Sequence, residues 1–71
     1  MRRGDLIERK EAVRAEIAQT RRELARARQA EATASERDRR KHARRIEELE
    51  TRLEALMAEE YSLRLQIDRA G

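Results

Sequence analysis

The sequence contains no cysteine, proline, phenylalanine or tryptophan, and its only two glycines are Gly4 and Gly71. Without cysteine there can be no disulfide and no thiolate metal site, and nothing indicates an oxidising compartment. Without proline or an internal glycine, no residue between positions 5 and 70 is a strong helix breaker. The single aromatic residue, a tyrosine, leaves little material for stacking on nucleobases.

Long apolar runs are also missing, so the sequence predicts neither a transmembrane helix nor a signal-peptide core. An amphipathic helix lying on a membrane would need phenylalanine or tryptophan and a broader apolar face. We therefore expect a cytoplasmic protein that does not act on a membrane.

Residues with catalytic or metal-binding chemistry are scattered rather than clustered. Four acids lie close together on one predicted helix, where we expect a solvated face: Glu47, Glu48, Glu50 and Glu54. His42 is the only histidine, and Asp38 supplies just one further ligand, which is too few for a metal site. There is no glycine-rich phosphate loop and no nucleophile elbow. We expect no enzymatic activity, no metal and no cofactor.

What the sequence does contain is charge and helix-forming residues. Charged residues make up 46% of the 71 positions, and alanine, glutamate, arginine and leucine dominate. This mixture is typical of a coiled coil or a long helix. A chain of this size forms one small all-α module, and such modules often need a partner to bury enough apolar surface.

Apolar residues recur at intervals of three and four in both halves of the chain, which predicts two heptad seams. Asp5 followed by Glu8 resembles an N-cap pattern, so the first helix is predicted over about 6–33. The second is predicted over about 38–69. The predicted core consists of Leu6, Val13, Ile17, Leu24, Ile46, Leu49, Leu53, Leu56, Leu63 and Ile67.

The two heptad frames differ by one residue, and the change falls within 28–45, where every apolar side chain is an alanine. A helical hairpin explains this change, because its two arms need not share a phase. In an antiparallel hairpin the numbers of facing residues add up to a constant. With a sum of 73, as for Leu6 with Ile67, large apolar core residues lie opposite each other and the turn falls at about 34–37. The alternatives are one long helix in a coiled-coil dimer, and an antiparallel dimer of straight helices.

A second apolar stripe lies beside the predicted core. Met57, Tyr61 and Leu65 are spaced by four, and Ile7 would lie near Leu65 in the antiparallel pairing. Two helices cannot cover both stripes. We expect a homodimer that closes into a four-helix bundle through this stripe, or alternatively a docking face for a different protein.

The middle of the chain is strongly basic, since residues 21–45 hold ten basic and four acidic side chains. The stretch SERDRRKHARR, residues 35–45, concentrates Arg37, Arg39, Arg40, Lys41, Arg44 and Arg45. Such a cluster suits an anionic partner, either a nucleic acid or an acidic protein surface. It also fits a solvated turn.

Leu49, Leu56 and Leu63 behind a basic run resemble a basic leucine zipper over about residues 31–67. Arg39 fits that family's pattern, but Glu31 stands where the family has asparagine. Glu31 removes the base-reading amide and adds repulsion toward phosphate, so we do not assign the chain to this family. The sequence instead predicts a non-enzymatic coiled-coil oligomerisation, adaptor or scaffold protein. The alternative is a small nucleic-acid-binding protein that uses residues 37–45.

Overall fold

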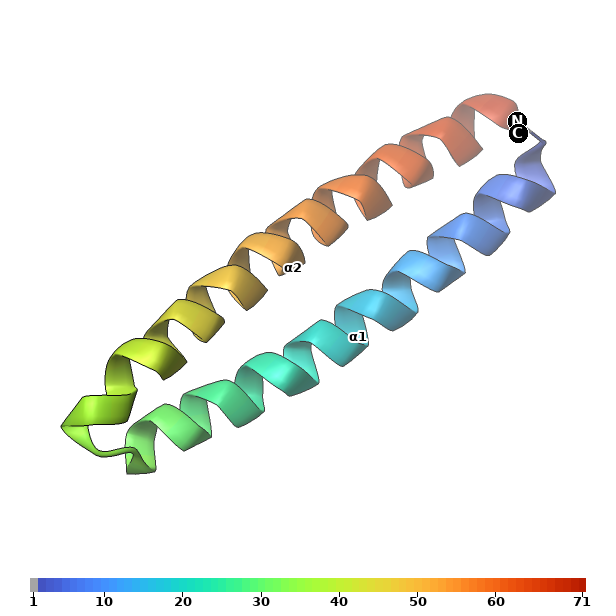
Figure 1. The fold of residues 1–71 in the computed structure, drawn as a ribbon. Helices are drawn as coiled ribbons and strands as arrows, with labels where there is room; N and C mark the ends of the chain where they lie inside the picture. The colour runs from blue at the N-terminus through green and yellow to red at the C-terminus, as the bar shows by residue number, and fades with distance from the viewer. Residues whose placement is uncertain (1) are drawn as a thin grey trace.

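Residues 2–71 form two long antiparallel helices in the computed structural model (Figure 1). Helix α1 spans Arg3–Thr33 and helix α2 spans Glu36–Ala70, and there is no strand among these residues. The rod measures 52 × 14 × 13 Å. A single continuous helix would extend about 105 Å at 1.5 Å per residue, so the long-helix alternative is excluded and the all-α helical hairpin is confirmed.

Helix α1 begins at Arg3, about three residues before the start that its apolar pattern predicts. The backbone N–H of Leu6 donates to the carbonyl of Arg2 at 3.1 Å, which closes the first turn. Asp5 lies within this turn rather than before it. Its carboxylate there interacts favourably with the positive end of the helix dipole.

The turn consists of Ala34 and Ser35, both in extended backbone conformation. The Ser35 carbonyl accepts from the N–H groups of Asp38 and Arg39 at 3.0 and 3.1 Å, so α2 starts at Glu36 instead of about residue 38. No residue of the described chain has a positive φ. Two extended residues therefore reverse the chain direction without the glycine or asparagine that a left-handed conformation would require.

The core lies along the line where the helices face each other. Eight of the ten predicted core residues are buried, and the other two, Ile46 and Leu53, are half-buried. One contiguous cluster occupies the half of the rod that carries the chain ends, and Leu53 packs against it. That cluster comprises Leu6, Val13, Ile17, Leu56, Leu63 and Ile67.

Thr20 interrupts the apolar core although it is almost fully buried, at 1% exposure. Its hydroxyl donates to the carbonyl of Glu16 at 2.7 Å, so the buried polar group is satisfied within α1. Leu24 and Leu49 are also buried but lie outside the main cluster. Closer to the turn, the half-buried positions on α1 are Ala27, Ala30 and Glu31, none of which has a large apolar side chain. The turn end of the rod therefore buries less apolar surface than the other end.

Neither helix carries a long enough apolar stretch, within residues 2–71, to cross a membrane.

Candidate protein interface

The two sides of the helix pair differ in how their charges are arranged. In heptad notation the core residues occupy positions a and d, the g position precedes a, and the e position follows d. In an antiparallel pair, g faces g and e faces e, on opposite sides of the core. We call the g side of this hairpin the closed side and the e side the open side.

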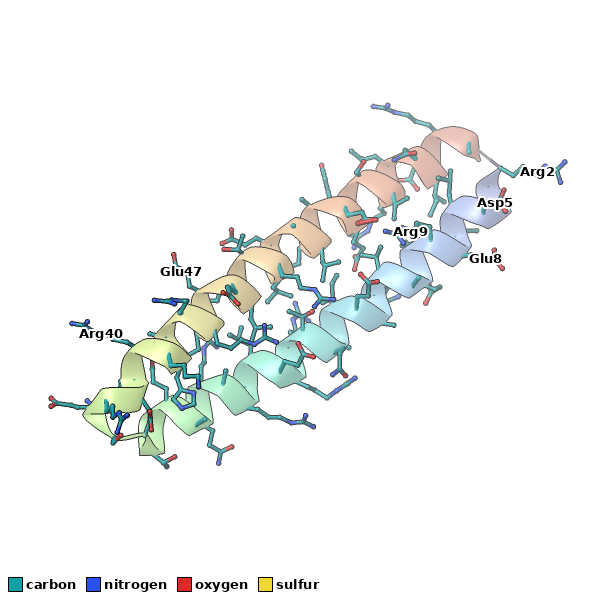
Figure 2. All side chains as sticks on the ribbon, in the orientation of Figure 1. Arg2, Asp5, Glu8, Arg9, Arg40 and Glu47 are labelled. Atoms are coloured by element: carbon teal, nitrogen blue, oxygen red, sulfur yellow. The ribbon has the colours of Figure 1, made fainter. Side chains whose placement is uncertain are left out.

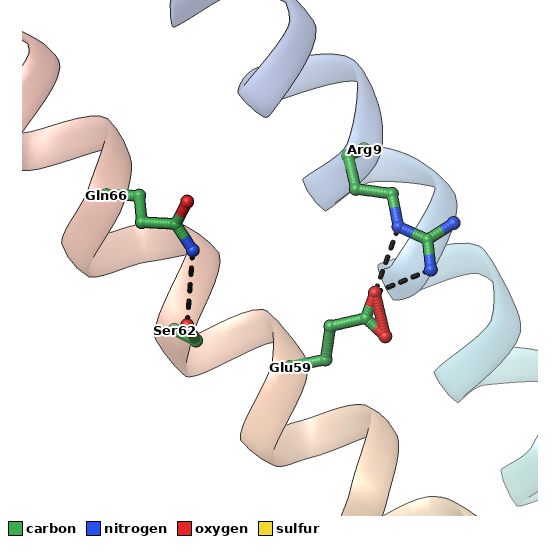
Figure 3. Close-up of polar contacts among 4 residues, drawn as sticks. All are labelled: Arg9, Glu59, Ser62 and Gln66. Atoms are coloured by element: carbon green, nitrogen blue, oxygen red, sulfur yellow. Dashed lines mark hydrogen bonds and ion pairs between the residues drawn. The ribbon is translucent and has the colours of Figure 1, made fainter. Parts of the chain in front are cut away.

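The closed side joins the helices through ion pairs of opposite charge. Arg9 of α1 donates from Nε to the carboxylate of Glu59 of α2 at 2.9 Å (Figure 3). Further toward the turn, Arg45 of α2 lies 3.8 Å from Glu23 of α1. Glu16 and Arg52, at the g positions between these pairs, also have opposite charges. Every g position from 9 to 23 therefore faces a residue of opposite sign.

Glu23 is the most enclosed carboxylate of these pairs, with its side chain 29% exposed. Its Oε1 accepts from the amide of Gln19 at 3.3 Å, whereas its Oε2 has no hydrogen-bond partner among the described residues. Arg45, at 3.8 Å, is beyond hydrogen-bonding distance and compensates only by charge. Arg45 also lies 3.7 Å from Glu48, so this arginine is near one acid of α1 and one acid of its own helix.

Within residues 2–71, the open side has only one interhelix ion pair, between Arg28 and Glu50 at 3.8 Å. The next facing pair toward the chain ends is Arg21 with Met57, and the one after that is Arg14 with Arg64. The charges there are thus unmatched or alike. Arg14 and Arg64 instead pair with acids of their own helices, Glu11 and Glu60.

The interhelix ion pairs also define the register of the hairpin. The residue numbers of the two partners add up to 68 in both closed-side ion pairs and to 78 in the open-side ion pair. These values lie equally far on either side of 73, the total predicted from the core pattern. Arg3 and Gly71 approach each other at the chain ends, so that a methyl group on Gly71 would lie 3.2 Å from the Arg3 Nε. Both ends of the rod agree with one register.

A groove of about 740 Å³ runs along the open side. We call it the open groove. Four cations and one acid line it, namely Lys10, Arg14, Arg21, Arg64 and Glu60. Its apolar lining consists of Ile17, Ala18, Met57 and Tyr61. Lys10 and Glu60 stand at core positions of the heptads and are half-buried, so the groove reaches the edge of the core.

The second apolar stripe predicted from the sequence is exposed on this hairpin. Exposure is 37% for Ile7, 47% for Met57, 61% for Tyr61 and 39% for Leu65. Met57 and Tyr61 line the open groove, and Leu65 continues the stripe one turn further along α2. We call these four residues the apolar stripe. Together with the groove, it gives the hairpin an uncovered face with both apolar and cationic character.

The basic segment predicted near the turn forms the first turns of α2, and all six of its predicted cations are exposed. Figure 2 shows Arg40 and, further along α2, Glu47 pointing away from α1. Among the described residues, five of the six cations form no ion pair: Arg37, Arg39, Arg40, Lys41 and Arg44. Arg45, the sixth, instead belongs to the closed side. We call the five free cations the basic tip.

The remaining candidate residues stay apart from one another. Glu48 and Glu50 are engaged in the ion pairs with Arg45 and Arg28, and Glu47 and Glu54 are exposed. His42 is half-buried beside Asp38 in a shallow depression of the basic tip. Residues 2–71 contain no group of three or more side chains that could hold a metal ion.

No family model, no curated protein and no solved structure matches this chain.

Sequence reasoning found the apolar stripe and the basic tip but missed the cations of the open groove. Lys10, Arg14, Arg21 and Arg64 are ordinary surface residues when each helix is read alone. The signal that could have identified them is the heptad register. On the open side, the numbers of facing residues add up to 78. Arg14 therefore faces Arg64 and Arg21 faces Met57, and this pairing reveals a side on which the charges are unmatched.

Proposed function

We propose that this chain is a non-enzymatic coiled-coil module for protein–protein interaction, acting as an adaptor, scaffold or oligomerisation element. The observation that carries the proposal is the exposure of Ile7, Met57, Tyr61 and Leu65 along one face of the hairpin. Fully burying a large apolar side chain contributes roughly 1.5–3 kcal/mol, so covering this stripe would add several kcal/mol to an association. Contiguous exposed apolar side chains rimmed by charge are characteristic of interaction surfaces.

Self-association is one way to cover the stripe. Two hairpins packed through it would form a four-helix bundle, as predicted from the sequence. Sedimentation equilibrium of the wild type and of Met57→Glu/Leu65→Glu tests this prediction. A dimer that the double substitution dissociates would support it, and a monomeric wild type at tens of micromolar would contradict it.

A photo-crosslinking amino acid at position 61 in the cell tests the interaction proposal itself. Tyr61 belongs to the stripe, whereas Ser62 is exposed one position further round α2 and serves as the matched control. We expect covalent adducts with a protein chain at position 61 and far fewer at position 62. If neither position yields adducts under conditions in which the chain is expressed and folded, the proposal is wrong.

The second candidate function is binding of nucleic acid through the basic tip. It is favoured by one observation, the five exposed cations without ion pairs at one end of the rod. Phosphate contacts made by these side chains would release counterions, so affinity should fall steeply between low and physiological salt. Titration of duplex DNA and of RNA at several salt concentrations tests this function. An affinity that does not depend on salt would exclude it.

A further inference from the structure

The open side lacks the internal charge neutralisation that the closed side has. The closed side matches Arg9 with Glu59 and Glu23 with Arg45 across the two helices. Across the open groove, Arg14 faces Arg64, and the lining holds four cations against the single acid Glu60. The formal charge of the groove lining is therefore +3. Glu11, which lies outside the lining, is 3.9 Å from Arg14 and offsets one of these charges, so a formal charge of +2 is left for solvent and salt to screen.

The apolar residues of α2 on this face are spaced so that they lie on one side of the helix. Met57, Tyr61 and Leu65 follow one another at intervals of four residues, so they form a ridge about 12 Å long at 1.5 Å per residue. A straight ridge beside a shallow groove suits another helix, which would pack its own apolar stripe against it at positions i, i+4 and i+7. Such packing would give a three-helix arrangement.

A second copy of this chain is a poor occupant of the groove. If a two-fold axis passed through the groove, Arg14, Arg21 and Arg64 of one copy would face the same cations of the other. Like charges brought together at an interface are unfavourable. A nucleic acid is also disfavoured here, because Glu60 and the apolar residues Met57 and Ile17 lie where phosphates would have to approach. The complementary ligand is apolar along its centre and acidic along its edges.

We propose that the open groove binds an amphipathic helix of another protein, one whose apolar stripe is flanked by aspartate or glutamate. The apolar stripe of the partner would pack on Met57, Tyr61 and Leu65. Its acids on the edge nearer α1 would reach Arg64 of α2 and Arg14 and Arg21 of α1. The inference rests on the proposed interaction function and specifies the chemistry of the partner.

Two synthetic peptides test the charge requirement. Both contain the same leucine stripe on an alanine-rich helix without aromatic residues, and they differ only in having glutamate or lysine on the flanks. Tyr61 is the only aromatic residue of the chain and lines the groove, so its fluorescence reports binding without a label. We expect the glutamate peptide to bind at least tenfold more tightly than the lysine peptide.

Charge reversal in the protein should invert this preference. The Arg14→Glu/Arg21→Glu variant is expected to bind the lysine peptide more tightly than the glutamate peptide. The matched control is Arg22→Glu/Arg26→Glu, which changes the net charge equally at exposed positions that do not line the groove, and which should keep the preference for glutamate. Circular dichroism establishes that each variant is folded. If the charge-reversal variant unfolds, Arg14→Gln/Arg21→Gln replaces it, and the preference for glutamate should then disappear.

Several results would overturn the inference. One is equal affinity for the two peptides, and another is a loss of preference in both charge-reversed variants alike. If position 61 crosslinks to a protein but neither peptide binds, the interaction function stands and the acidic-helix partner is wrong. If the adducts at position 61 are exclusively with a second copy of the chain, the groove is a homodimer interface, and the inference is again wrong.

Discussion

Arg9 donates two hydrogen bonds to one carboxylate oxygen of Glu59, which lies 50 residues further along the chain and on the other helix. Both side chains are substantially exposed, at 50% and 37%, so the pair contributes little to stability by itself. Its importance is geometric, because the two atoms can meet only when α1 and α2 are in one register. The same holds for Glu23 and Arg45, whose residue numbers also add up to 68 and which therefore require the same register.

A charge reversal at this pair should be rescued by the reciprocal change. Arg9→Glu places like charges side by side and should lower the free energy of unfolding by about 0.5–1 kcal/mol. Adding Glu59→Arg restores opposite charges and should recover most of that loss. Urea denaturation of the two single variants, the double variant and the wild type measures the coupling. Simple additivity of the two single effects would show that the contact does not form in solution.

Two leucines two residues apart on α2 should respond very differently to truncation. Leu63 is 6% exposed and belongs to the core cluster, whereas Leu65 is 39% exposed on the apolar stripe. Leu63→Ala should cost about 2–5 kcal/mol, because it removes buried methyl groups and leaves a cavity. Leu65→Ala should cost less than about 1 kcal/mol in the isolated chain. Similar effects of the two substitutions on the urea midpoint would mean that the helix is rotated relative to this structure.

Replacing the hydroxyl of Thr20 with a methyl group should stabilise the hairpin. The hydroxyl is buried at a core position, and it bonds to a Glu16 carbonyl that lies within the regular helix. Thr20→Val should therefore leave no buried group unsatisfied while adding apolar contact, for a gain of about 0.5–1 kcal/mol. Thr51→Val on the exposed face of α2 is the control and should change stability by less than about 0.5 kcal/mol. A loss of stability at position 20 would show that the hydroxyl bond outweighs the apolar gain.

Removing charge from the basic tip should separate binding from folding. Arg40→Gln/Lys41→Gln/Arg44→Gln removes like-charged i,i+4 pairs such as Arg40 with Arg44 and cuts no ion pair, so helicity and thermal stability should stay the same or rise slightly. Binding of any anionic partner at the tip should be lost.

Arg45→Gln, by contrast, should lower stability by up to about 1 kcal/mol, because Glu23 loses the cation that lies near its buried oxygen. Circular dichroism and salt-dependent binding measurements on both variants check the distinction. Unfolding of the triple variant would assign the tip a structural role.

The heptad pattern was sufficient for the architecture because large apolar residues such as Leu6, Ile17 and Leu56 stand at regular core positions. The turn was harder to locate. Ala34 and Ser35 are ordinary residues that adopt extended conformations permitted to any side chain, so composition carries no distinctive signal for them. The open groove depends on which residues face each other across two helices. That relationship exists only after the register is fixed, which is why Arg14 and Arg64 were not singled out from the sequence.

The uneven distribution of large side chains along the rod has a consequence for the order in which the hairpin assembles. The extensive apolar cluster lies far from the turn, where contacts such as Arg9 with Glu59 close a loop of 50 residues. Near the turn, Glu23 with Arg45 closes a much shorter loop beside the buried Leu24 and Leu49, but the α1 positions beyond them, Ala27 and Ala30, contribute few apolar contacts. Doubling a loop costs only about 0.6 kcal/mol in closure entropy, less than the burial of one leucine. Folding should thus be initiated by distant residues meeting, with the two-residue turn ordering afterwards rather than acting as the nucleus.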